Sequence, residues 1–512
     1  MLAIKRNLLG NFAGKIWVTL VNYGSIPFYL KLLGMEAYGL VAFNATLNAL
    51  FALLDFGFSM TMNKGLAKLS EEQDSADEGR DFLRTIEAIY WPISILIVTT
   101  IALLAPLISS RWLTPETISQ LRVQKAVMLM GASIACLWPY TLYQGGMLGL
   151  QKQVKMNFLS ACFATAQSFG GVIALMAFGA TLEVYFYWQI LVSITMSLVT
   201  MLTLWRSLPK GSRPARFKLS ILKQEWGFSI GMLGISVASY FSLQADKLLL
   251  GKLVSLKLYA CYSVASQACN LITLCVFPIT TAIFPRVVQL LHRKEEVELT
   301  GLYHKTSQYI SFITIPLAAT LCCFATPITK VIERFSSKPL LIQHTDKVMS
   351  ILAIGALFHA LTQFPHLVQL AANWTKLWLV HNLISIFIQI PLMVCMTQRY
   401  GISGCATVYL LLTTSYLLIQ IPVMHTRLIL GEAKRWFLQD VGVIGAIVFS
   451  SGFLLRTFAS ESDSILVILL KVPFIFMVLL GMSFLASSYL RNSISVIVKK
   501  NFLKIANENE AS

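Results

Sequence analysis

Long apolar segments recur along the whole 512-residue chain, and short polar loops separate them. Each segment has about 20 residues or more, the length that an α-helix needs to cross a hydrocarbon core of about 30 Å. Hydrophobic residues make up 56% of the chain and charged residues 13%, whereas soluble proteins carry about 25% charged residues. Because lipid cannot satisfy backbone polar groups, the pattern predicts an all-α integral membrane protein.

About fourteen such spans can be counted from the apolar runs, with both chain ends on the cytoplasmic side. The predicted inner loops carry most of the Lys and Arg, as expected for membrane proteins. These loops also account for most of the net charge of +17. The positive charge therefore does not indicate a nucleic-acid partner, and the predicted partners include membrane lipids. The first span, Leu8 to Leu30, is too long for a signal peptide and has no cleavage site, so we expect it to be retained.

The two halves of the chain repeat. Pro106 and Pro327 each end the third span of their half, and they are 221 residues apart. Six spans are an even number, so the copies share an orientation and an axis along the membrane normal. The sequence therefore predicts two pseudo-symmetric six-helix bundles around a central polar cavity, followed by a helix pair. The predicted parts are an N-terminal bundle at 1–205, a basic cytoplasmic linker at 206–225, a C-terminal bundle at 226–435, the extra helix pair at 436–491 and a cytoplasmic tail at 492–512.

Polar residues interrupt the second span. Asn44, Asn48, Asp55 and Ser59 occur at helical spacing, so we expect them to share one face of one helix. A carboxylate inside the membrane costs about 2.5–3.5 kcal/mol unless it faces protein, water or a cation. This helix is therefore predicted to line a hydrated cavity. Lys15 on the first span would lie at a similar depth and face Asp55, or alternatively reach the inner headgroups.

Two motifs carry a resemblance to a known family. The first seventy residues contain LLGMEAYG, of the form LG-x-E-x-YG, and LLDFGF, and the second half contains ADKLLLGKLVSLKLYACYSVASQ. With these motifs the chain resembles, over its full length, the O-antigen-type flippases of the multidrug/oligosaccharidyl-lipid/polysaccharide (MOP) superfamily. Lys257-Leu258 departs from the family pattern, in which a small residue or Gly is usual. The resemblance implies a bacterial inner-membrane protein that flips an undecaprenyl-pyrophosphate-linked oligosaccharide to the periplasmic leaflet for O-antigen, capsule or exopolysaccharide synthesis. It also implies the polysaccharide polymerase and export machinery as partners.

Such a substrate needs cations for its pyrophosphate and amides for its sugars. The predicted cations are Lys15, Lys31, Lys64, Lys247 and Arg286. The predicted sugar-contacting amides are Asn22, Asn44, Asn48, Gln267 and Asn270. Lys64 and Arg286 are expected to end helices two and eight at the inner mouth, where ordinary interface anchoring is the alternative. Lys247 has a local ion pair with Asp246 as its alternative.

The energy source is less clear from the sequence. The ion-coupling candidates inside the spans are Asp55, Glu87, Asp246, His359 and His366. Each has a satisfied buried polar group as its alternative, and downhill flipping requires no coupling residue. The chain has no P-loop, so ATP hydrolysis is not predicted. Its nine cysteines lie almost wholly within apolar spans without C-x-x-C spacing, so neither a metal nor any other cofactor is expected.

Two other functions remain open. A cation-coupled multidrug or metabolite antiporter of the same superfamily would have the same two halves, but a more apolar cavity with fewer cations. A membrane-embedded polysaccharide polymerase or ligase would usually need a long outer loop with clustered acids or histidines, which the predicted topology lacks. We therefore expect a transporter with no catalytic residues rather than an enzyme.

Overall fold

The computed structural model describes residues 2–55, 57–69, 76–221, 237, 240–241, 244–336, 340–372, 374, 376–457 and 464–491, with side chains for all but 2–13, 54, 335–336 and 340–343. The predicted tail at 492–512 and the linker residues 222–225 lie outside the described residues. The described part is almost entirely helical, and its only β contact is an isolated bridge between Thr114 and Ser255. The predicted all-α class is confirmed.

The helices pack into two compact units. The first unit is Met1–Ser263 together with Phe335–Ser337. Its elements are α1 (Leu2–Leu33), α2 (Met35–Phe51), the 3₁₀ turn η1 (Ala52–Asp55), α3 (Phe58–Leu69), α4 (Ala76–Leu107), the π-helical turn η2 (Ile108–Trp112), α5 (Gln120–Leu137), α6 (Pro139–Gly149), α7 (Gln153–Phe178), α8 (Leu182–Trp205) and the first turns of α10 (Leu256–Leu274).

The second unit begins at Val264, inside α10. Its further elements are α11 (Val276–Arg293), α12 (Glu296–Cys323), α13 (Ala325–Ser336), α14 (Leu340–Ala371), α15 (Lys376–Ser415), the π-helical turn η3 (Tyr416–Gln420), α16 (Ile421–His425), α17 (Ala433–Arg435), the π-helical stretch η4 (Trp436–Gly442), α18 (Val443–Arg456) and α19 (Ile465–Ala486). The packing boundary lies in α10 and not in the predicted linker. The repeat of two six-helix bundles stays a prediction.

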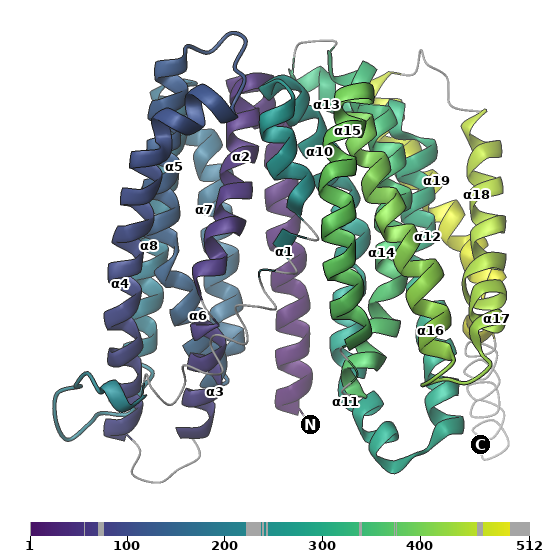
Figure 1. Ribbon diagram of the computed structural model, residues 1–512, viewed down its shortest axis with the longest axis horizontal. Helices are drawn as coiled ribbons and strands as arrows, with labels where there is room; N and C mark the ends of the chain where they lie inside the picture. The colour runs from purple at the N-terminus through teal and green to yellow at the C-terminus, as the bar shows by residue number, and fades with distance from the viewer. Residues whose placement is uncertain are drawn as a thin grey trace, which may run out of the picture. The chain divides into compact units, whose positions relative to one another are not determined.

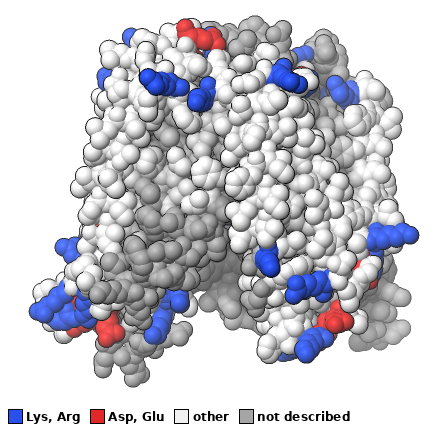
Figure 2. Space-filling model, viewed as in Figure 1, with Lys and Arg blue, Asp and Glu red and all other residues white. Residues whose placement is uncertain are grey.

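Ten stretches of the described chain are long and apolar enough to cross a membrane. The longest, Lys376–His425, has 50 residues and contains a break at Gly401, where φ is 62°. A glycine with positive φ allows one continuous apolar stretch to supply two spans. In Figure 1, α1 and the α2–α3 pair run alongside the other spans of the first unit. Most charged side chains of the visible face lie near the helix ends (Figure 2), as expected for membrane helices.

Glycine permits one backbone contact that positions the second span. α3 packs against α6 through Gly145 and Gly149, one helical turn apart. A Cβ atom added at Gly145 would lie 2.3 Å from the carbonyl oxygen of Ser59, and one at Gly149 would lie 2.4 Å from that of Asn63. Such close approach requires small residues, as in G-x-x-x-G helix pairs.

Candidate functional site

The second span is not one helix. α2 ends at Phe51, η1 follows, and α3 begins at Phe58 after Gly57, whose φ is 73°. The single face predicted for Asn44, Asn48, Asp55 and Ser59 is therefore wrong, because the break changes the helical register between the two asparagines and Asp55. Broken membrane helices are tolerated where backbone groups face protein or a hydrated cavity, and they commonly form transporter sites.

Asp55 lies at this break. Its Oδ2 accepts hydrogen bonds from the hydroxyl of Ser59 at 2.8 Å and from the backbone N–H of Ser59 at 3.3 Å. The carboxylate thus caps the first turn of α3, where the partial positive charge of the helix start favours an anion. Tyr90 of α4 donates to the other carboxylate oxygen. Lys15 is not among these partners, so the predicted Lys15–Asp55 pairing is wrong.

Aromatic residues hold Tyr90 in place. Its ring is fully buried and stacks on Trp138 with centroids 4.2 Å apart, and Phe58 contacts it edge to face at 6.3 Å. Because the tyrosine hydroxyl is fixed, one oxygen of Asp55 is committed to α4. Asp55 itself is half-buried, so the carboxylate is accessible in part at the broken helix.

The amides of the first unit have different surroundings. Asn44 and Asn48 are half-buried on α2, and the side-chain oxygen of Asn44 is buried with no partner among the described residues. Asn22 on α1 accepts a hydrogen bond at 2.8 Å from Ser168 of α7. Lys15 and Lys31 are both exposed on α1. The predicted polar residues of α1 and α2 thus stand on helices of one unit, with Asn44 offering an unsatisfied acceptor.

The motif glutamate of LG-x-E-x-YG has a structural role that the sequence did not reveal. Buried Glu36 accepts backbone N–H bonds from Glu116 at 2.5 Å, Thr117 at 3.0 Å and Ile118 at 3.3 Å, and a further bond from the Thr117 hydroxyl. These residues lie in the loop between η2 and α5. One carboxylate therefore ties the start of α2 to a loop about eighty residues away.

The same loop binds the start of α10. Thr114 donates its hydroxyl to the carbonyl of Val254 at 2.7 Å, and its own carbonyl accepts the N–H of Leu256 at 3.3 Å. Lys257 pairs with Glu116, which lowers the pKa of the Glu116 carboxyl. The departure from the family pattern at Lys257 thus has a function, because this lysine forms an ion pair that a small residue could not.

Direct contacts join α2 to α10. The hydroxyls of Thr46 and Tyr259 are 2.7 Å apart and buried, and Tyr240 donates to the carbonyl of Thr46 at 3.1 Å. A Cβ atom at Gly39 would lie 2.4 Å from the carbonyl oxygen of Leu256, so only glycine allows this approach. We call these contacts, together with those of Glu36 and Lys257, the α2–α10 latch. Tyr259 lies at the position that the predicted repeat aligns with Tyr38.

The predicted residues of the second half are dispersed. Arg286 is exposed within α11, two turns before its end, and pairs with Glu298 at 2.7 Å. Lys64, also exposed, lies inside α3, which continues to Leu69. The expectation that both cations end their helices is therefore wrong. Gln267 is half-buried and Asn270 exposed, the latter accepting from Thr273 at 2.8 Å.

Asp246 does not pair with Lys247. Asp246 is buried and accepts a hydrogen bond from the hydroxyl of Tyr262 at 2.6 Å, while its second oxygen has no partner among the described residues. Lys247 is half-buried. The alternative of a local ion pair is thus wrong, because neighbouring residues on a helix point in different directions.

Glu87 is a satisfied buried carboxylate. It accepts hydrogen bonds from Tyr143 at 2.7 Å and from Trp205 at 3.4 Å, and it pairs with Arg84 at 3.2 Å. These partners come from α6, α8 and one turn earlier on α4. The arrangement favours a structural role over the predicted coupling role, because Arg84 supplies a countercharge and the other two donors satisfy the carboxylate oxygens.

The two candidate histidines lie two turns apart on α14. His359 is buried, with its Nε2 2.7 Å from the amide nitrogen of Gln363. The ring of His366 stacks on Trp378 with centroids 3.7 Å apart. The Nδ1 atoms of both rings are buried without hydrogen-bond partners in the described structure.

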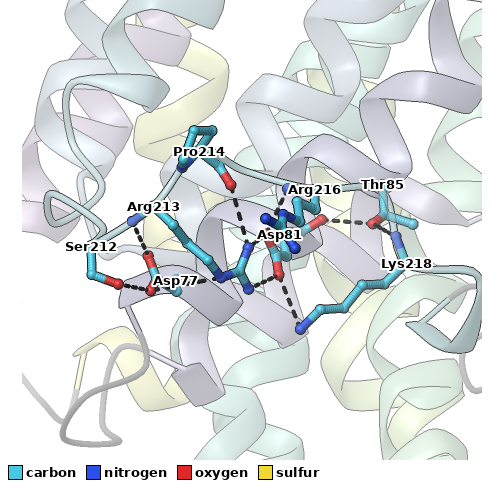
Figure 3. Close-up of polar contacts among 8 residues, drawn as sticks. All are labelled: Asp77, Asp81, Thr85, Ser212, Arg213, Pro214, Arg216 and Lys218. Atoms are coloured by element: carbon cyan, nitrogen blue, oxygen red, sulfur yellow. Dashed lines mark hydrogen bonds and ion pairs between the residues drawn. The ribbon is translucent and has the colours of Figure 1, made fainter.

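The basic linker is held by acids. Asp81 of α4 is fully buried and binds Arg213 at 2.6 Å, Lys218 at 3.0 Å and the backbone N–H of Arg216 at 2.7 Å (Figure 3). Asp77 accepts from Ser212 and pairs with Arg213. Residues 214–218 are not helical, and residues 219–221 are. The first two turns of α4 thus anchor the linker.

A protein-family model described as "Polysaccharide biosynthesis protein" matches residues 30–338. This region is more than half of the chain, and it includes both motif regions, the broken span and the α2–α10 latch. The chain belongs to this polysaccharide biosynthesis family. A search of curated proteins finds no significant match.

The fold of this family member is shared with solved transporters. The lipid II flippase MurJ, in an inward closed conformation, matches with a TM-score of 0.73 and 15% identity, over 95% of this chain and 99% of that chain. An inward-facing MATE-family multidrug resistance transporter of the MOP superfamily matches with a TM-score of 0.64 and 12% identity, over 82% of this chain and 96% of that chain. The MATE transporter DinF-BH in complex with R6G matches with a TM-score of 0.62 and 13% identity, over 83% of this chain and 95% of that chain.

Chemically, the first unit of this polysaccharide biosynthesis protein offers a half-buried carboxylate, an unsatisfied amide oxygen and exposed lysines on adjacent spans. These groups can hydrogen-bond hydroxyls and attract anions. The arrangement suits binding and release of a polar group.

Proposed function

We propose that this protein is a flippase that moves an undecaprenyl-pyrophosphate-linked oligosaccharide from the cytoplasmic to the periplasmic leaflet of the bacterial inner membrane. The proposal places both chain ends in the cytoplasm and the product in surface polysaccharide synthesis. Membership of the polysaccharide biosynthesis family carries the proposal. The fold that the chain shares with the lipid II flippase MurJ supports it.

The broken second span suits the polar head of this substrate. Sugar hydroxyls need both donors and acceptors, and the partly accessible Asp55 together with Asn44 and Asn48 supplies them. Lys15 and Lys31 are exposed on α1 and would attract the pyrophosphate. The lipid tail can remain in the bilayer, so only the head requires a polar route.

The α2–α10 latch suits a gate of an alternating-access cycle. Its contacts are few, polar and specific, so they can form and break as a unit. Tyr259 and Thr46 share one buried hydrogen bond, which contributes about 0.5–1.5 kcal/mol to the stability of the closed latch. We assign the end of the first unit that carries the latch to the periplasmic side. Opening of the latch would release the head group there.

A cation-coupled antiporter is the second candidate. The match to MATE multidrug transporters and the carboxylate at the helix break favour it. A carboxylate that alternately binds a cation and a substrate is a simple coupling device. In that case Asp55 would be essential, whereas the exposed lysines of α1 would not.

Reconstitution separates the two candidates. The protein is placed in liposomes containing a fluorescent undecaprenyl-pyrophosphate oligosaccharide, and an enzyme added outside removes the accessible sugar. The flippase proposal expects the protected fraction to fall only when the protein is present. Lys15→Gln should slow this loss, and Lys210→Gln, at an exposed linker position, should not.

The antiporter would give the opposite pattern. Protein-containing vesicles would accumulate an organic cation under a proton or sodium gradient, and the protected oligosaccharide fraction would equal that of protein-free vesicles. In cells lacking their own flippase, surface polysaccharide should return with the wild-type protein. Failure of both the vesicle and the cell experiment would refute the proposed function.

A further inference from the structure

A buried histidine in the second unit lies between two carboxylates. Nδ1 of His304 is 2.5 Å from Oδ2 of Asp440, and its Nε2 is 3.0 Å from Oε2 of Glu432. The side chains of His304 and Asp440 are fully buried, and that of Glu432 is 28% exposed. His304 comes from α12, Glu432 directly precedes α17, and Asp440 lies in the π-helical stretch η4. We call these residues the His304 triad.

Neutral imidazole has only one N–H, so it cannot donate to both carboxylates. If both acids were ionised, one ring nitrogen would direct a lone pair at a carboxylate oxygen. The two short distances therefore require one additional proton within the triad. The structure must assign that proton to the ring or to one of the acids.

Gln308 fixes one oxygen of Asp440 as an acceptor. Its side-chain oxygen accepts the backbone N–H of Tyr489 at 3.1 Å and the hydroxyl of Ser487 at 2.7 Å. Since a backbone N–H can only donate, the orientation of this amide is fixed. The amide nitrogen consequently donates to the remaining oxygen of Asp440 at 2.9 Å. Oδ1 of Asp440 thus acts as an acceptor. We assign the proton between Nδ1 and Oδ2 to the ring, because imidazole (ordinary pKa about 6.5) is more basic than a carboxylate (about 4).

A cation also lies beside Glu432. The guanidinium of Arg435 lies 3.7 Å from the same oxygen that contacts His304. With both acids as acceptors, the ring must donate from both nitrogens. The four charges of His304, Arg435, Glu432 and Asp440 then cancel. Without the proton, the triad would bury an uncompensated negative charge, which is strongly destabilising.

The surrounding groups are consistent with one bound proton. His425 of α16 already uses its Nδ1 on the carbonyl of Ile421 at 2.7 Å, and Tyr303 lies between the two histidines, 5.6 Å from the ring of His304 and 5.4 Å from that of His425. Just after α19, the hydroxyl of Tyr489 accepts from Arg435 at 3.2 Å. On η4, Trp436 donates to Ser307 of α12. None of these contacts supplies a second charge to the histidine ring.

We propose that the His304 triad is a proton-binding site, with the ring of His304 doubly protonated between ionised Asp440 and Glu432. The proton exchanges with solvent through the partly exposed Glu432. When the proton is lost, Nε2 can no longer donate a hydrogen bond to Glu432. The group then also carries a net negative charge beside buried Asp440. The segment from Glu432 to Asp440, which joins the C-terminal helix pair to α12, then loses one of its contacts. π-Helical stretches such as η4 often occur at functional sites.

Nitrogen-15 NMR of histidine-labelled full-length protein in lipid tests the site. At about pH 8, above the ordinary imidazole pKa of about 6.5, an unpaired histidine has one N–H. The proposal expects one of the seven histidines to keep both nitrogens protonated at this pH. The signal should disappear in His304→Gln and persist in His292→Gln, a substitution of an exposed histidine at the end of α11.

Glu432→Gln provides a variant at a partly exposed position, which should fold even if His304→Gln does not. Its amide can donate to Nε2, so the ring should become neutral at the same pH while remaining bonded to Asp440. The proposal is overturned if every histidine of the wild type has one unprotonated nitrogen at about pH 8. It is also overturned if the doubly protonated signal survives in Glu432→Gln unchanged.

Discussion

The glycine contact between α3 and α6 makes a quantitative prediction about the position of the helix break. Gly145 and Gly149 approach the carbonyls of Ser59 and Asn63, and Ser59 is the residue that bonds Asp55. Alanine at either glycine would place a Cβ atom 2.3 or 2.4 Å from a carbonyl oxygen, whereas ordinary contacts begin at 3.4 Å. The two helices must therefore move apart by about 1 Å, because the obstructing atom is backbone and cannot rotate away.

Overpacking of this size costs about 1–3 kcal/mol. For a unit of this size we expect a Tm lowered by about 3–10 °C in each single variant. The double variant should cost less than the sum of the singles, since the separation that admits the first methyl group nearly admits the second. Neighbouring sites that share one displacement are not additive.

Thermal unfolding of the purified full-length protein in detergent, followed by intrinsic fluorescence, measures these changes. Gly481→Ala is the matched control, because a Cβ atom there would meet nothing within 4 Å. That substitution should leave Tm unchanged or raise it slightly, since alanine favours helix. Unchanged stability in both Gly145→Ala and Gly149→Ala, or strictly additive losses, would refute the reasoning.

Three further predictions concern the latch and the linker. Tyr259→Phe removes the buried hydrogen bond to Thr46 and should lower the free energy of unfolding by about 0.5–1.5 kcal/mol. Tyr187→Phe, at an exposed ring, should leave it unchanged. Equal melting temperatures for Tyr259→Phe and the wild type would contradict this. Lys257 lowers the pKa of Glu116, so the ion pair stabilises the protein at pH values above the ordinary carboxyl pKa. This stabilisation is lost as the pH falls through the lowered pKa of Glu116. A melting series from about pH 6 to about pH 3 should thus show a steeper acid loss for wild type than for Lys257→Gln, and less so at high salt. Asp81→Asn should release the linker and speed tryptic cleavage within residues 206–218, whereas Glu78→Gln, at an exposed position, should leave the cleavage rate as it is.

Much of the architecture follows from hydropathy alone. Uninterrupted apolar runs of this length can only be helices in lipid, so the all-α class could be predicted. The motifs also led to the correct family. Asp55 was identified as unusual because any ionisable residue within a span needs a reason.

The partners of those residues were not predictable in the same way. The pairing of Lys15 with Asp55 was inferred from depth, yet depth does not determine which side of a helix faces its neighbour. The break before Gly57 rotated Asp55 away from the face of Asn48 and brought it to Tyr90. Arg286 and the linker cations look like anchors in sequence, but Glu298 and Asp81 bind them.

The sequence by itself determined that this protein is a bundle of membrane helices with a polar second span, because the cost of polar groups in lipid depends on composition along each segment. Only the tertiary structure decided that Glu36 holds a loop, that Lys257 completes a latch and that His304 lies between two acids. Hydrogen bonds depend on distances of about 3 Å and on direction. Such contacts join residues some eighty to one hundred and forty positions apart, a scale on which periodicity carries no information.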